Sequence, residues 1–125
     1  MAKQHSPEFL KISEAARAKV REVTVDQVKA KLDAQQKFHL IDVREESEWA
    51  QDHVKGAVHL GKGIIERDIE NTVPDPNAEI VLYCGGGFRS ALAAENLQKM
   101  GYKNVLSMDG GIRLWREKNY PLSKD

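Results

Sequence analysis

The first part of the chain carries apolar residues at the spacing of an amphipathic helix. These residues are Phe9, Ile12, Ala16 and Val20. The pattern predicts a helix over about residues 7–20 that buries this face. Ser6, Pro7 and Glu8 form a favourable start, since a hydroxyl can cap the first amides, proline suits the first turn and an acid faces the positive end of the helix dipole.

A second helix is predicted directly after this one. Thr24 and Gln27 stand three residues apart, which is the spacing of a capping box. Val25, Val28 and Leu32 then supply the apolar side of the helix.

Four short apolar runs have the length and composition of strands that are buried on both faces, as in a parallel sheet. They are FHLIDV (38–43), AVHL (57–60), EIVLYC (79–84) and NVLSM (104–108). The segments between and after them are predicted to be helical, over about residues 47–51, 61–73, 90–100 and 112–119. Gly101 suits a left-handed cap at the end of one of these helices. The alternation predicts one α/β domain with a mainly parallel sheet of about five strands flanked by helices.

Composition and charge narrow the classes of partner. The chain has 125 residues, and its 19 basic and 19 acidic residues cancel, so no strong electrostatic field points to nucleic acid or an anionic membrane. No segment resembles a signal peptide or a membrane span, which predicts a cytoplasmic protein. The four histidines lack the spacing of metal ligands, and we expect neither a metal nor another cofactor. We expect the protein to be a monomer or a weak homodimer.

The chain has one cysteine, Cys84, at the end of a predicted strand and before three glycines. Ligand sites of parallel α/β sheets lie beyond the carboxyl ends of the strands. Glycines allow a tight loop whose N–H groups converge, and the helix that follows adds its unpaired amides. A thiol at the centre of these donors is favoured as its nucleophilic anion. Among the glycines, we expect Gly86 to need backbone angles that valine rarely adopts.

Several motifs, taken in order, resemble the rhodanese family of sulfurtransferases over about residues 23–122. LIDVRE is similar to a strand that ends in Asp-x-Arg, here Asp42 and Arg44. SEWAQDHVKGAVHL is similar to a family segment that begins with an acidic and an aromatic residue and continues to a histidine, here His53. Asp52 and Lys55 stand where the family usually has Gly and Pro. CGGGFRS resembles the active-site loop, and DGGIRLWREKNYPL resembles the closing signature. The resemblance implies a rhodanese-like domain over residues 21–125 and an N-terminal helical extension over residues 1–20.

The resemblance also implies a double displacement. Cys84 takes the sulfane sulfur of a donor such as thiosulfate as a persulfide, and a thiophilic acceptor such as cyanide, a small thiol or a protein thiol then removes it. The expected substrate-binding residues are Gly85, Gly86, Gly87, Phe88, Arg89, Ser90, Lys62 and Arg113. Phe88 is expected to form one wall of the pocket mouth.

Other residues of these motifs have structural interpretations. Arg89 can contact substrate or brace the loop by bonding carbonyls. Asp42, Arg44 and His53 are expected to be structural residues near the site. Trp49 and Trp115 are expected to be core aromatics.

Two rival functions stay open at the level of sequence. A phosphatase or arsenate reductase of this architecture also closes a cysteine loop with arginine, but places it six positions after the cysteine. Here Arg89 follows Cys84 by five positions, which favours the smaller sulfur-binding loop. A sulfur-carrier or binding module without turnover would also retain Cys84.

Overall fold

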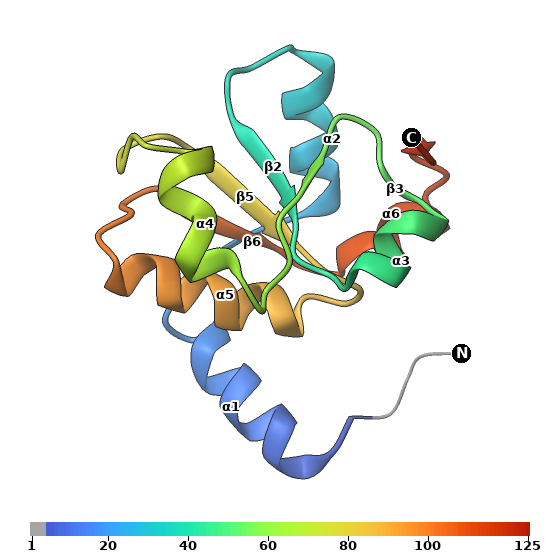
Figure 1. The fold of residues 1–125 in the computed structure, drawn as a ribbon. Coiled ribbons are helices and arrows are strands. Elements are labelled where there is room, and N and C mark those ends of the chain that lie inside the picture. Colours follow the sequence, from blue (N-terminus) through green and yellow to red (C-terminus); the bar gives the residue numbers. More distant parts are fainter. Residues whose placement is uncertain (1–4) are drawn as a thin grey trace.

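The computed structural model describes residues 5–125, which form a five-stranded parallel sheet with helices on both faces (Figure 1). The strand order is β1-β6-β5-β2-β4, and a separate antiparallel pair joins β3 to β7. The strands are β1 (Arg21–Val23), β2 (His39–Asp42), β3 (His53–Val54), β4 (Val58–His59), β5 (Ile80–Tyr83), β6 (Val105–Met108) and β7 (Leu122–Ser123). The helices are α1 (Pro7–Arg17), α2 (Val25–Asp33), α3 (Glu46–Gln51), α4 (Ile65–Thr72), α5 (Phe88–Lys99) and α6 (Gly111–Glu117). The predicted fold class is confirmed.

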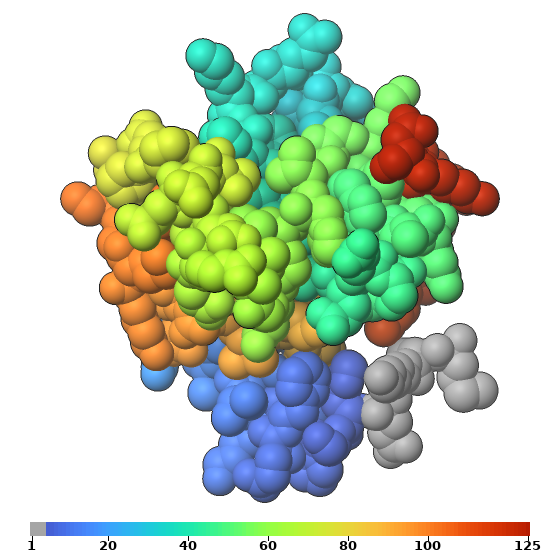
Figure 2. Space-filling model, in the orientation of Figure 1, coloured from blue at the N-terminus to red at the C-terminus, as the bar shows by residue number. Residues whose placement is uncertain are grey.

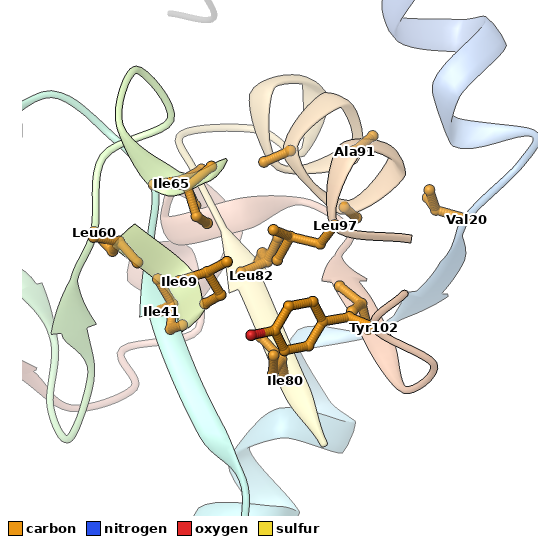
Figure 3. Close-up of a cluster of buried hydrophobic side chains, with 14 of the residues drawn as sticks. Val20, Ile41, Leu60, Ile65, Ile69, Ile80, Leu82, Ala91, Leu97 and Tyr102 are labelled. Atoms are coloured by element: carbon orange, nitrogen blue, oxygen red, sulfur yellow. The ribbon is translucent and has the colours of Figure 1, made fainter. Parts of the chain in front are cut away.

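The central strand β5 divides its side chains between two cores because successive residues of a strand point to opposite faces. Ile80 and Leu82 enter a core shared with α4 and α5, which Figure 3 shows in part. Val81 and Tyr83 enter a second core with α2 and α6, where Trp115 is fully buried. The side chain of Cys84, the residue after Tyr83, therefore lies on the α5 side of the sheet.

Helix α1 lies outside the sheet and packs along α5 (Figure 1). Its buried residues are Ser13 and Ala16, whose small side chains suit a close approach between two helices. Ile12 was predicted on this face, but it lies to one side and is 56% exposed. Ser6 occupies the N-cap as predicted, but its side chain forms no capping hydrogen bond; its carbonyl accepts one from the Leu10 amide instead.

The other helix ends follow the sequence more closely. The Thr24–Gln27 capping box is confirmed in both directions, with bonds of 3.0 and 2.9 Å. Gly101 follows α5 with φ +100°, the predicted left-handed conformation. Strand β1 was not predicted, because it is only three residues long and only Val23 among them is buried.

Candidate active site

Cys84 directly follows β5 and lies in the turn that leads to α5. Cys84 is 1% exposed to solvent, and it lines an open pocket of about 750 Å³ at the carboxyl end of the sheet. The sulfur therefore lies at the inner end of a pocket and not on the open surface. This position is the one predicted from the strand-glycine-helix order.

Two backbone amides donate hydrogen bonds to the Cys84 sulfur. The Gly87 amide nitrogen lies 3.1 Å from Sγ, and the Ser90 amide nitrogen lies 3.4 Å from it. The Cys84 thiol in turn donates to the Ser90 hydroxyl at 3.6 Å, and that hydroxyl shares a hydrogen bond of 2.8 Å with the Ser107 hydroxyl. Because charged acceptors form the stronger hydrogen bonds, the two amides favour negative charge on the sulfur or on a sulfur atom attached to it.

Among the three loop glycines, the positive φ belongs to Gly87, at +106°. Gly86, which was predicted to need this conformation, is outside the left-handed region. The reason is local: α5 begins at Phe88, and the residue that turns the chain into the helix is the one before it. A left-handed residue at this point directs its own amide to Sγ.

The start of α6 forms hydrogen bonds with the backbone of the loop that contains Cys84. The Ile112 amide donates to the Cys84 carbonyl at 2.9 Å, and the Arg113 amide donates to the Gly85 carbonyl at 3.1 Å. These amides belong to the first turn of a helix, where no partner exists within the helix itself. The loop is thus held between two helix starts, α5 on the sulfur side and α6 on the carbonyl side.

Arg89 forms an ion pair with Glu48 of α3, with N–O distances of 2.7 and 3.0 Å. The hydrogen bond from Arg89 lowers the pKa of Glu48 to about 2, and partial burial opposes that shift. The same bond is the main reason that the pKa of Arg89 is raised. Sequence analysis offered carbonyls as the partners for bracing, whereas the partner is this carboxylate. Glu48 lies in the SEWAQDHVKGAVHL segment, but no role had been predicted for it.

Asp42 is the last residue of β2, and it forms a buried ion pair of 2.8 Å with Arg44, two positions later. The exposed fractions of the two side chains are 0% and 3%, and Arg44 also donates to the Asp52 carbonyl at 2.7 Å. The pair joins the turn after β2 to the end of α3, which agrees with a structural role near the site.

His53 is buried, and its Nδ1 lies 3.0 Å from the Trp49 carbonyl. Its ring stacks on that of Trp49 with centroids 3.5 Å apart. Trp49 is half-buried, so the prediction of a core residue was only partly right, whereas Trp115 is fully buried.

The pocket is lined by side chains from α1, α3, α5 and α6, together with the loop that contains Cys84. Phe88, Arg89 and Arg113 are lining residues that had been predicted to bind substrate. Lys62, which had also been predicted to bind substrate, lies in the turn between β4 and α4 and is not among the lining residues. His5, Phe9 and Arg116 also line the pocket, and none of them had been predicted there. Phe9 was predicted only as part of the buried face of a helix, and Arg116 lies in the closing signature without a predicted role.

Residues 24–118 match the Rhodanese-like domain. The chain belongs to this family. Its relative YtwF of Bacillus subtilis is 32% identical over 102 residues, which are 82% of this chain and 96% of YtwF. The thiosulfate sulfurtransferase PspE of Escherichia coli is 38% identical over 72 residues, 58% of this chain and 69% of PspE. The chain spans only 52% of another relative, YrkF of Bacillus subtilis.

A solved structure matches nearly the whole rhodanese-like chain. It is that of RPA3614 from Rhodopseudomonas palustris, described as a protein of unknown function and possible tyrosine phosphatase. The TM-score is 0.83 at 26% identity, over 98% of this chain and 99% of that one. The names of the sulfurtransferase relatives support sulfur transfer as the general activity. Within the part of the chain that the structure describes, no helix is long and apolar enough to span a membrane.

Proposed function

We propose that this protein transfers a sulfane sulfur from a donor such as thiosulfate to cyanide or a thiol, through a persulfide on Cys84. The observation that carries the proposal is the set of donors at Sγ, above all the Gly87 amide at 3.1 Å and the Ser90 amide at 3.4 Å. Donors fixed in advance around a charged sulfur lower the cost of holding it there during the reaction.

In the first step the Cys84 thiolate attacks the outer sulfur of thiosulfate. The S–S bond of thiosulfate breaks, and its electron pair leaves with sulfite. A new bond joins Sγ to the transferred sulfur, which keeps one negative charge as a persulfide anion. Because the nucleophile enters as an anion and the product remains one, no general base is needed.

In the second step the acceptor attacks the outer sulfur of the persulfide. Cyanide leaves as thiocyanate, or a thiolate leaves as its own persulfide, and the electron pair of the broken S–S bond returns to Cys84. The Cys84 side chain therefore carries one negative charge in both states, on Sγ in the resting state and on the outer sulfur in the loaded state. The same amides serve both states.

The Arg89–Glu48 pair supports sulfur transfer over phosphate chemistry. A phosphatase loop needs an arginine that is free to hold the oxyanion, and here both terminal nitrogens of Arg89 bond to Glu48. The five-residue interval from Cys84 to Arg89 also makes a smaller loop than phosphatases use.

Intact mass tests the proposal directly because Cys84 is the only cysteine of the chain. Incubation with thiosulfate is expected to add the mass of one sulfur atom, and cyanide is expected to remove it. Cys84→Ser should give neither the adduct nor turnover while it retains the native circular dichroism spectrum. A wild-type protein that forms no adduct but hydrolyses an aryl phosphate through Cys84 would be a phosphatase, and the proposal would be wrong.

A further inference from the structure

Three aromatic rings from distant parts of the chain come together at the pocket. The His5 ring centroid lies 4.7 Å from that of Phe88 and 5.1 Å from that of Phe9. The Phe9 and Phe88 centroids are 6.2 Å apart, within the usual range for aromatic pairs. All three residues line the pocket that contains Cys84, and we call them the aromatic wall.

The aromatic wall joins the N-terminal segment to the catalytic loop. His5 precedes α1, Phe9 lies in its first turn and Phe88 opens α5. The Arg17 guanidinium lies over the Phe88 ring, 5.7 Å from its centroid, and adds a second contact between α1 and Phe88. Figure 2 shows the surface of α1 directly adjoining that of α5. The contacts therefore belong to a packed helix pair.

The wall is open to the pocket and is not sealed in a core. All three residues are half-buried, so part of each ring remains available to a ligand. Covering such apolar surface with an apolar group is favourable because it removes that surface from water. Small-molecule sites commonly combine such a wall with a few polar groups that orient the ligand.

A positive charge lines the same pocket. Arg44, Arg89 and Arg116 each have a carboxylate partner, whereas Arg113 forms no ion pair within residues 5–125. Its guanidinium lies over the catalytic loop, since a Cβ built on Gly86 would be 3.4 Å from Nη1. The pocket thus offers an anion partner together with an aromatic surface near the reactive sulfur.

We infer that the aromatic wall is a subsite for an aromatic group on the sulfur donor, and that the donor class it favours is the arylthiosulfonates. This inference rests on the proposed function. An arylthiosulfonate has the terminal sulfur of thiosulfate and an aromatic ring in place of one charged oxygen, so it carries one negative charge where thiosulfate carries two. The Cys84 thiolate attacks its terminal sulfur, the S–S bond breaks, and the electron pair leaves with arylsulfinate. The persulfide that forms on Cys84 keeps one negative charge.

This subsite is an addition to the rhodanese-like domain. Residues 24–118 match the family, and both His5 and Phe9 lie before them. The N-terminal helix is therefore the specificity-determining element, and Phe9 and His5 are the residues through which it acts.

The test compares two donors that differ only in the group on the sulfonyl sulfur. Sodium benzenethiosulfonate and sodium methanethiosulfonate are each used with cyanide as acceptor, and thiocyanate is measured. Phe9→Ala is expected to lower kcat/KM for the benzene donor by about threefold to tenfold, the range for losing one aromatic contact. The methane donor should change by less than about twofold, since a methyl group has no aromatic ring to pair with the wall.

Ile12→Ala is the matched control, because Ile12 belongs to the same helix, is exposed and does not line the pocket. It should leave the ratio of the two kcat/KM values unchanged. His5→Ala provides a second variant that leaves the helix intact, and it should shift the ratio in the same direction as Phe9→Ala. Melting temperatures confirm that α1 remains docked.

Equal loss for both donors in Phe9→Ala and His5→Ala would overturn the inference and make the wall purely structural. Failure of the proposed function has a different signature. In that case the wild-type protein acquires no sulfur from thiosulfate or from either thiosulfonate, and the inference fails with it.

Discussion

Gly111 packs against the backbone of Cys84 so closely that a side chain does not fit between them. A Cβ built on Gly111 would lie 2.5 Å from the Cys84 carbonyl oxygen and 2.5 Å from that of Gly85. Gly111 also has φ +57°, a conformation that side chains disfavour. This close contact allows the first amides of α6 to bond to the carbonyls of Cys84 and Gly85. A glycine 27 positions after Cys84 therefore helps to determine the shape of the loop that contains it.

Gly111→Ala is expected to displace the loop and lower kcat/KM for sulfur transfer at least about tenfold, because misplaced reacting groups are costly. Unfolding free energy should fall by about 1–3 kcal/mol through overpacking and backbone strain. Steady-state kinetics and urea denaturation measure the two effects. Gly63→Ala is the control, since a Cβ there meets no atom within 4 Å. Wild-type activity in Gly111→Ala would mean that the loop shape does not depend on α6.

Gly87 and Gly86 are expected to respond differently to alanine. Gly87→Ala places a side chain at φ +106° and disturbs the amide that donates to Sγ, so persulfide formation should slow at least about tenfold. Gly86→Ala meets only the flexible Arg113 side chain at 3.4 Å and should change the rate by less than about threefold. Stopped-flow or quenched mass spectrometry measures the rate. The reverse order would show that the Gly87 amide is not a stabilising donor.

Arg113→Ala is expected to raise KM for thiosulfate about threefold to tenfold, because the pocket loses a charge-assisted contact to an anion. The effect should shrink as salt is added, since ionic strength screens an exposed charge. Lys62→Ala removes the same charge from a residue that does not line the pocket and should change KM by less than about twofold. Kinetics at two salt concentrations distinguish the variants. Equal effects would indicate attraction by the overall field, with no specific contact at Arg113.

The contribution of Glu48 to stability is expected to depend on pH in a defined window. Its pKa is lowered to about 2 by the hydrogen bond from Arg89, whereas an unfolded Glu titrates near 4.3. The ionised form therefore stabilises the fold above about pH 4.3, and this contribution is lost as pH falls towards about 2. Urea denaturation of wild type and Glu48→Gln should show a constant difference from pH 7 to 5 that shrinks at lower pH. Glu117→Gln, on an exposed residue, is the control. A difference independent of pH would assign the effect to packing.

The order of helices and strands could be predicted from the sequence because it depends on local periodicity. The apolar run before Cys84 indicated a buried strand, and Thr24 with Gln27 indicated a helix start; both patterns involve neighbours within a few residues. Short elements were not predicted, because they contain too few residues to show a period. Strand β1 has three residues and one buried side chain, too few to form a period.

The sequence by itself determined the candidate site, which consists of one cysteine after a strand, glycines beside it and a helix beyond, all adjacent in the chain. Only the tertiary structure decided how that centre is completed. In the folded chain, Gly87 has the positive φ and Phe9 lies at the pocket. Arg89 pairs with Glu48, which is 41 residues away in the sequence. The physical reason is that these choices depend on contacts between segments far apart in sequence, which form only when the helices pack on the sheet and which no local pattern encodes.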